Sequence, residues 1–410
     1  MLYDLANTVY AATLTFLFTP FAERALGGDL RWIGIVQFVS MVLAGLLVPL
    51  LGALADQTAR TRGYLATATL LCIAGTAGFA LDAGPVVLLG CFFVANITYN
   101  LGLLFYNTLL PAVAEPGREG RLSGLGTGVG YGGTLLVLAL LLPIHTPATQ
   151  FVLAAALFLG TALPCLLLVP DPRPPRAGSR VAAMGGALRQ LGATLRELPR
   201  HRSLLWFLLG NFCLVDVLNT AILYFASFTL AVFRPALATG GATLFGHVFV
   251  ADDGGVALVT VCGFALNGLA LGFGILQGAW TDRAPLAVMR ASAVALFGAL
   301  VGGALFGGHS VLGYLLTLVG LGAFGLSGIW TAGRKVVLLL APPARAGEFF
   351  GLYGITVKLS VFGSALYGFV SYHAGVKPAM LAQGMQLLLG LACLAMVRMP
   401  ARTAPPPPRA

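Results

Sequence analysis

The sequence predicts an all-α membrane protein with twelve transmembrane helices arranged as two six-helix pseudo-repeats. Three observations predict this fold class. Of the 410 residues, 58% are hydrophobic and only 9% are charged, whereas about 25% of the residues of a typical soluble protein carry a charge. Long apolar runs recur from one end of the chain to the other. A short motif also occurs twice, at a separation of about half the chain, which is typical of an internal repeat.

The apolar runs have the length of membrane-spanning helices. About 20 mostly apolar residues are needed to cross roughly 30 Å of hydrocarbon. The runs are too long and too continuous for the alternating strands of an outer-membrane barrel, so we expect helices. The runs of the first half are 3–22, 32–54, 64–82, 86–110, 122–143 and 150–169. The runs of the second half are 204–233, 255–280, 286–306, 310–333, 348–372 and 379–398.

The basic residues predict the orientation of these helices. Nineteen of the 24 lysines and arginines fall in the loops on one side, and Lys358 falls inside a run. The loops on the other side contain only Arg24, Arg31, Arg234 and Lys377. Because loops rich in Lys and Arg stay in the cytoplasm, we expect both chain ends to be cytoplasmic. The expected location is the plasma (inner) membrane, crossed many times.

The chain divides into two halves of six runs. We expect the N-terminal half to span 1–169, a cytoplasmic linker 170–203, the C-terminal half 204–398, and a disordered proline-rich tail 399–410. The linker begins with DPRPPRAGSR and continues with leucines at helical spacing. This spacing predicts an amphipathic helix on the cytoplasmic face. A solvated, disordered linker remains the alternative.

Several function classes are excluded by the sequence. The net charge of +10 comes from short basic clusters between apolar runs, a pattern of membrane topology rather than of nucleic-acid binding. The six cysteines and five histidines are scattered singly, so no metal site is expected. The nucleotide-binding pattern GxxxxGK[ST] is absent. We therefore expect no cofactor and no enzymatic activity.

Three motifs occur once in each half. The pattern P-x-R-x-G-x-x-x-G-L begins at Pro116 and again at Pro343. The pattern G-x-x-x-D ends the second run at 52–56 and the eighth run at 278–282. The pattern D-x-x-N occurs at 4–7 and at 216–219, near the start of each half. Because the three pairs follow the same order in both halves, they indicate a duplication.

The chain as a whole resembles the major facilitator superfamily. The segments that carry the resemblance are YDLANTVY at 3–10, YNTLLPAVAEPGREGRLSGLGTGVGYGG at 106–133, DVLNT at 216–220 and LAPPARAGEFFGLYGITVKLSVFGSALYG at 340–368. These segments resemble the unknown major facilitator family, which includes the autophagy-related vacuolar effluxers. The outer loop 234–254 and the run Gly363-Ser364-Ala365 depart from the family pattern.

The resemblance implies a cavity lined by helices 1, 4, 7 and 10. The ionisable residues inside the runs each need a partner, a cavity or a function, because a charge in the bilayer is costly. The candidates for substrate binding or coupling are Asp4, Asn7, Tyr106, Asn107, Asp216, Asn219, Arg334 and Lys358, and Asn100 is a further polar candidate. For the lone asparagines, a hydrogen bond between helices is an equally acceptable interpretation.

A cytoplasmic gate is also implied by the resemblance. Its residues are Gly52, Asp56, Arg60, Gly278, Asp282 and Arg283. Asp56 and Arg60 are expected to pair and to dock on a helix end of the opposite half. An ordinary solvated helix cap is the alternative for Asp56.

Two more specific hypotheses follow from depth in the membrane. Asp216 and Lys358 lie about 18 Å and about 15 Å from the starts of their helices, so we expect them to form a coupling pair; a static ion pair is the alternative. Only three residues precede Asp4. We therefore expect that roughly eight to twelve residues precede the given sequence, since a charged amino terminus would otherwise lie in the bilayer.

The predicted function is secondary active transport by alternating access. The expected solute is small and polar, such as an amino acid that is exported, and the expected driving force is a proton gradient. The expected partners are this solute, protons and the lipid bilayer, with no nucleic acid, and the expected state is a monomer. The alternatives are a carrier of drugs, sugars or peptide fragments, and a non-transporting receptor or lipid scramblase on the same fold.

Overall fold

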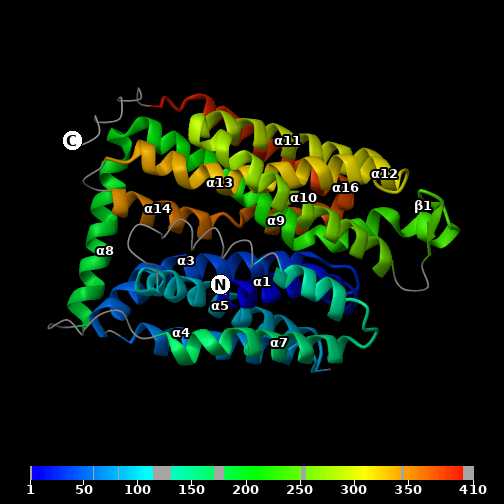
Figure 1. Ribbon diagram of the computed structural model, residues 1–410, viewed down its shortest axis with the longest axis horizontal. Coiled ribbons are helices and arrows are strands. Elements are labelled where there is room, and N and C mark those ends of the chain that lie inside the picture. The colour runs from blue at the N-terminus through cyan, green and yellow to red at the C-terminus, as the bar shows by residue number, and fades with distance from the viewer. Residues whose placement is uncertain are drawn as a thin grey trace, which may run out of the picture.

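The structure is a computed structural model that describes residues 2–58, 60–81, 83–113, 130, 132–169, 180–250, 255–342 and 346–399. The described part is a bundle of long helices in two layers, one for each half of the chain (Figure 1). In that view the N-terminal half lies below the C-terminal half, and α8 runs across one end of both layers. We call this end the α8 end, and the opposite end, which carries a small β-hairpin, the hairpin end.

The N-terminal half contains the first predicted spans. Its first span is continuous but changes its winding, from an α-helix to a π-helical stretch and back. Its elements are α1 (Leu2–Ala12), η1 (Thr13–Phe18), α2 (Thr19–Ala25), α3 (Arg31–Thr58), α4 (Thr61–Gly78), α5 (Pro85–Val113), η2 (Val137–Leu141) and α7 (Pro147–Leu168).

The linker and the C-terminal half follow. The linker contains α8 (Arg180–Glu197), where the sequence predicts an amphipathic helix, and η3 (Leu198–Arg200). The C-terminal half contains α9 (Arg202–Thr239), β1 (Ala242–Leu244), β2 (His247–Phe249), α10 (Val256–Arg283), α11 (Pro285–Phe306), α12 (Val311–Tyr314), η4 (Leu315–Leu321), α13 (Gly322–Leu340), α14 (Ala346–Leu359), α15 (Phe362–Ala374) and α16 (Val376–Ala395).

The helix positions agree with the predicted spans. Ten helices of the described chain are long and apolar enough to cross a membrane. The two other predicted spans correspond to α4 and to a shorter apolar helix, Gly132–Leu141, which is the described part of the run 122–143. The all-helical membrane fold is therefore confirmed, and the described helices are consistent with twelve spans.

The last-but-one predicted span, 348–372, is broken in two. It consists of α14 and α15, and the helix is interrupted at Ser360 and Val361. No proline lies in this stretch, so the break needs another physical cause. The cause is a set of side-chain contacts from α9 and α16, which are described with the functional site.

The loop after α9 forms the β-hairpin at the hairpin end of the bundle. β1 pairs with β2 in antiparallel register, with Leu244 opposite His247. The two residues between them, Phe245 and Gly246, have φ values of 48° and 85°. Two successive positive φ angles are those of a type I′ turn, whose twist suits a two-residue hairpin.

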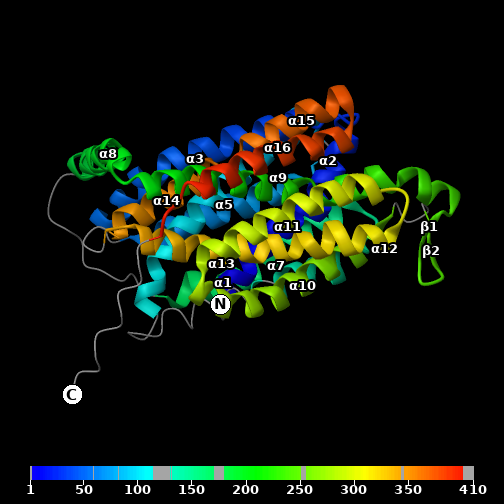
Figure 2. The ribbon, with the colours of Figure 1, turned by 90° about the horizontal axis from the view of Figure 1, so that it is seen from above.

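At the hairpin end the two halves touch through backbone. A methyl group on Gly34 of α3 would lie 2.4 Å from the carbonyl oxygen of Ser364 in α15. One on Gly368 would lie 2.8 Å from the carbonyl oxygen of Leu30. The Arg31 guanidinium also lies 3.3 Å above the centre of the Tyr372 ring. In Figure 2, α3 and α15 run side by side to this end. Glycine is required at both positions because a side chain would separate the halves.

Candidate functional site

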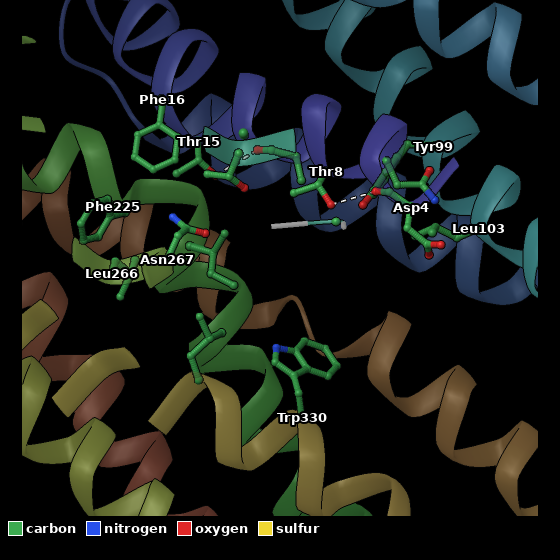
Figure 3. A pocket seen from close by; sticks show the side chains of 17 residues that line it. Asp4, Thr8, Thr15, Phe16, Tyr99, Leu103, Phe225, Leu266, Asn267 and Trp330 are labelled. Carbon is green, nitrogen blue, oxygen red and sulfur yellow. Dashed lines mark hydrogen bonds between the residues drawn. The ribbon is translucent and has the colours of Figure 1, made fainter. Parts of the chain in front are cut away.

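A cavity of about 360 Å³ lies between the two halves. Its lining residues come from α1, η1, α5 and the positions Gly130 and Thr134 of the N-terminal half, and from α9, α10 and α13 of the C-terminal half (Figure 3). Its polar lining residues are Asp4, Asn7, Thr8, Thr15, Tyr99, Thr134, Asn267 and Trp330. The volume is in the lower part of the range of small-molecule sites. We call it the central cavity.

Asp4 gives the central cavity its charge. It is the only Asp, Glu, Lys, Arg or His among the described lining residues. Its carboxylate accepts a hydrogen bond of 2.5 Å from the Tyr106 hydroxyl. The Tyr106 ring stacks on Tyr3 at a centroid distance of 4.7 Å, and the Tyr3 hydroxyl is hydrogen-bonded to Thr69 at 2.7 Å. This chain of contacts fixes the carboxylate at the cavity wall, where it can meet a positively charged group.

The opposite wall offers uncharged polar and aromatic surface. Trp330 of α13 and Asn267 of α10 line the cavity from the C-terminal half, across from Thr8 and Asp4 (Figure 3). An indole face attracts a cation through its quadrupole. An amide such as that of Asn267 has both a donor and an acceptor. The two walls together can therefore bind the ammonium group and the polar groups of one small solute.

The hairpin end of the central cavity is closed by apolar side chains from both halves. Phe16 of η1 meets Phe225 of α9 edge to face at 6.0 Å. The face of Gly263 in α10 is packed so tightly that a methyl group there would lie 3.0 Å from both Phe16 and Leu138. We call Phe16, Leu138, Phe225 and Gly263 the apolar seal.

A second cavity, of about 270 Å³, lies beyond the apolar seal. It is lined by residues that include Arg24, His145 and Gln150, and by Phe16, which also lines the central cavity. Phe16 therefore separates two cavities that lie along the same path between the halves. A transporter that closes at the hairpin end needs such a barrier.

The predicted pair of Asp216 and Lys358 is not formed, and this prediction is wrong for the present structure. Asp216 is fully buried. Its two carboxylate oxygens accept hydrogen bonds of 2.8 and 2.9 Å from the backbone N–H of Gly363, and it also accepts one from Gln386 of α16. Depth along two helices fixes only one coordinate, and the carboxylate is satisfied by the start of α15 instead.

Lys358 reaches across to the other half. Its ammonium group donates a hydrogen bond of 2.6 Å to the side-chain oxygen of Asn100 in α5. Asn96, one turn earlier, donates hydrogen bonds to Gln37 at 3.0 Å and to Ser40 at 2.7 Å, both in α3. A polar network therefore joins the halves beside the central cavity. Lys358 itself is not among the described lining residues of that cavity.

The other predicted binding residues are dispersed. Asn7 lines the central cavity. Asn219 donates a hydrogen bond of 2.8 Å to the carbonyl of Ser360 at the helix break. Asn107 and Arg334 are exposed and lie outside the described lining. Of the eight predicted residues, the structure brings Asp4, Asn7 and Tyr106 together at the central cavity.

The predicted gate residues are only partly described. Asp282 forms an ion pair with Lys335 of α13, in its own half. The side chain of Asp56 lies outside the described residues, so its expected pairing with Arg60 stays a prediction. Arg60 precedes α4 and is exposed. The further gate positions, Gly52, Gly278 and Arg283, lie at the same ends of α3 and α10.

Sequence reasoning missed the C-terminal wall of the central cavity. Asn267 and Trp330 lie in the middle of long apolar runs. A search for every polar or aromatic side chain within the spans would have found them, since such residues are expensive in a bilayer and are retained at solute pathways. The glutamines of α16 that surround Asp216 carry the same signal.

Comparisons with known proteins identify the family of the chain. A family model described as "Vacuole effluxer Atg22 like" matches residues 114–403. The "Uncharacterized MFS-type transporter YxiO" of Bacillus subtilis is 23% identical, over 97% of this chain and 93% of its own length. Autophagy-related protein 22-1 of Aspergillus niger is 25% identical over 68% of this chain, which spans 47% of that longer protein.

Solved structures show the same fold. The nucleoside transporter NupG, in a mutant form, superposes with a TM-score of 0.73 at 16% identity, covering 97% of this chain and 99% of its own. The peptide transporter POT, in a mutant form in complex with sulfate, gives a TM-score of 0.67 at 15% identity, covering 96% and 92%. These similarities establish the architecture of a major facilitator.

Proposed function

The chain belongs to the family of Atg22-like vacuole effluxers, and from this premise we propose that it exports a small amino acid or a related polar metabolite in exchange for protons. That it is a multi-pass membrane transporter of the major facilitator kind follows from the family and the fold. The proposal concerns the identity of the solute, the driving ion and the direction of transport.

One observation carries it: the central cavity combines one carboxylate with uncharged polar groups. Asp4 suits the ammonium group of the solute, with the indole of Trp330 opposite. Asn7 and Asn267 have amide N–H groups for the carboxylate of an amino acid, and Asn267 has a second N–H besides the one it donates to the carbonyl of Gly263. The Thr8 hydroxyl donates to the backbone carbonyl of Asp4. A cavity of about 360 Å³ suits such a solute rather than a large drug.

We assign the membrane orientation from the distribution of the basic residues. The linker helix α8 and the loops at its end carry most of the arginines, so the α8 end is assigned to the cytoplasm and the hairpin end to the outside of the plasma membrane. Both chain ends are then cytoplasmic. The apolar seal at the hairpin end supports the proposal that, in this state, the carrier exchanges its solute with the cytoplasm. In this proposal, the cytoplasmic gate closes in the opposite state.

Counterflow in proteoliposomes tests this proposal. The purified protein is reconstituted into vesicles loaded with a panel of unlabelled amino acids, and the uptake of each radiolabelled amino acid is followed. At least one amino acid should show saturable exchange, and Asp4→Asn should reduce it at least tenfold. Leu316→Ala, an exposed apolar position on η4 away from the central cavity, is the matched control and should retain exchange.

Three outcomes contradict the proposal. Exchange of sugars or peptides but of no amino acid would assign another substrate class. Saturable binding without flux would indicate a receptor. Exchange of a fluorescent lipid between the leaflets, without solute flux, would indicate a scramblase.

A further inference from the structure

The break between α14 and α15 is held together by two residues of one motif on α9. Asp216 accepts the N–H of Gly363, which is one of the free N–H groups at the start of α15. Asn219 donates to the carbonyl of Ser360, which follows the end of α14. The pattern D-x-x-N places both side chains on the same face of α9, one turn apart. Asp216 and Asn219 therefore satisfy the polar groups that the break exposes inside the bundle.

The environment of the Asp216 carboxylate contains hydrogen-bond acceptors without donors. A methyl group on Gly363 would lie 2.6 Å from the side-chain oxygen of Gln383, 2.7 Å from the Thr220 hydroxyl and 3.2 Å from an Asp216 oxygen. Three oxygens therefore surround one point. Within the described residues, the side-chain oxygens of Gln383 and Gln386 are buried and accept no hydrogen bond. A buried acceptor without a donor is costly.

A proton on Asp216 supplies a donor for one of these two oxygens. The carboxylic acid has an O–H that can donate to a neighbouring oxygen, while its other oxygen still accepts the N–H of Gly363. The ionised form has no such donor, but it binds the positive end of α15 more strongly. The two protonation states would therefore hold α15 with different strength.

The groups around Asp216 leave it as the site of titration. The titratable side chain facing it on α9 is Cys213, which in turn lies near Cys393 of α16. On α14, Lys358 is hydrogen-bonded to Asn100 of the other half. On α15, Tyr367 stacks on Tyr224, which lies on α9 about two turns after Asp216. Among these described neighbours no charged side chain forms an ion pair with the carboxylate.

α15 connects Asp216 to the backbone contact between the two halves at the hairpin end. α15 is the helix whose Ser364 and Gly368 touch the backbone of α3. Its first turn is tied to the C-terminal half by Asp216, and Gln383 of α16 donates a hydrogen bond of 3.2 Å to the carbonyl of Gly363. Weakening the bond to Asp216 loosens α15 at its start and so favours its separation from α3.

We propose that Asp216 takes up and releases the coupling proton, and that its ionised form locks α15 against α3 while its protonated form releases it. This inference rests on the proposed function for its use in transport. It assigns the proton to a buried position in the C-terminal half, while Asp4 in the central cavity binds the solute. The two carboxylates of the two D-x-x-N motifs then have separate tasks.

Cysteine labelling tests the assignment without any solute. The parent protein has all six cysteines replaced, which also removes the thiols of Cys213 and Cys393. It carries one new cysteine in place of Ser364, which is buried against α3. A membrane-impermeant maleimide is added to cells from outside at a series of pH values. Each rate is divided by that of Thr243→Cys, an exposed position on β1, to correct for the reactivity of the thiol.

The normalised rate at Ser364→Cys should rise as the pH falls. Above its midpoint it should change about tenfold for each pH unit, as expected for one proton. Asp216→Asn should make the rate high and independent of pH. Asn219→Ala, which damages the same break but keeps the carboxylate, should raise the rate and retain the pH dependence. If both variants lose the pH dependence, or both retain it, Asp216 only supports the structure and the proposal fails.

Two further measurements keep the proposal open to refutation if Asp216→Asn does not fold. Gln383→Met removes an acceptor for the proton and should lower the midpoint by about one pH unit; an unchanged midpoint overturns the proposal. Replacing Na⁺ by choline should change nothing, whereas a rate that depends on Na⁺ at constant pH assigns the site to a metal ion instead. Because labelling requires no solute, a protein that fails the counterflow test can still pass this one, and the two failures are distinguishable.

Discussion

Gly34→Ala should open the hairpin end of the molecule. The added methyl group would lie 2.4 Å from the carbonyl oxygen of Ser364 and 3.0 Å from the Cα of Ala365. An ordinary carbon–oxygen contact is about 3.3 Å, so α3 and α15 must separate by about 1 Å. Overpacking of this kind costs about 1–3 kcal/mol. That cost falls on the state in which the helices touch, and it reduces the population of this state about 5- to 150-fold relative to the open one.

Double electron–electron resonance, which measures the distance between two spin labels, detects this change. Spin labels at Trp32 of α3 and Phe369 of α15, both exposed, report the separation of the two helices. Gly34→Ala should add a longer-distance population and lower the melting temperature. Gly368→Ala, whose methyl group would lie 2.8 Å from the Leu30 carbonyl, should act in the same direction and more weakly.

Gly272→Ala is the matched control, because a methyl group at that position meets nothing within 4 Å. It should leave both the distance distribution and the melting temperature unchanged. If Gly34→Ala behaves like this control, the contact of α3 with α15 does not keep the hairpin end closed. The reasoning that this backbone contact holds the two halves together at the hairpin end would then be refuted.

Three further predictions concern single contacts. Phe16→Ala should join the two cavities across the apolar seal. Vesicles with this variant should therefore leak protons, which an internal pH dye measures, and the protein should lose about 3–5 kcal/mol of stability. Lys358→Met should lower stability by about 1 kcal/mol more than Lys358→Gln, which keeps a donor for Asn100; equal melting curves would contradict this. The hydrogen bond from Arg31 lowers the pKa of Asp29. The pair of Arg31 and Asp29 therefore stabilises the fold above the ordinary pKa of an aspartate, about 3.9, and this stabilisation is lost as the pH falls below that value. Arg31→Gln should remove it, so the stability of the protein should depend less on pH at the acid end of the profile.

The helices could be predicted from the sequence because each one is specified locally. An apolar run of about 20 residues has no other way to satisfy its backbone in a bilayer. The break at Ser360 and Val361 could not be predicted in this way. It is stabilised by Asp216, more than 140 residues earlier, and by Gln386 of α16. Nothing in the local sequence distinguishes that stretch from a continuous helix.

Only those residues of the candidate site could be predicted that are polar and lie within apolar runs. Asp4 and Tyr106 are each polar residues in apolar runs, and they meet at the central cavity. The partner of Lys358 could not be predicted, because its position along the helix does not say which way the side chain points. It points to Asn100 in the other half. Rotation about a helix axis is set by packing between helices, which one sequence does not contain.

The two D-x-x-N motifs have diverged in use, and their asparagines allow this to be measured. Asn7 lines the central cavity, whereas Asn219 is hydrogen-bonded to the carbonyl of Ser360 within the C-terminal half. Asn7→Ala should therefore raise the KM for the solute and leave the melting temperature nearly unchanged. Asn219→Ala leaves a carbonyl without its donor inside the bundle, which costs about 1–3 kcal/mol, and should lower the melting temperature in detergent. If the two variants shift KM and melting temperature to the same extent, the duplicated motifs still share one function, and the division between solute binding in one half and control of α15 in the other is wrong.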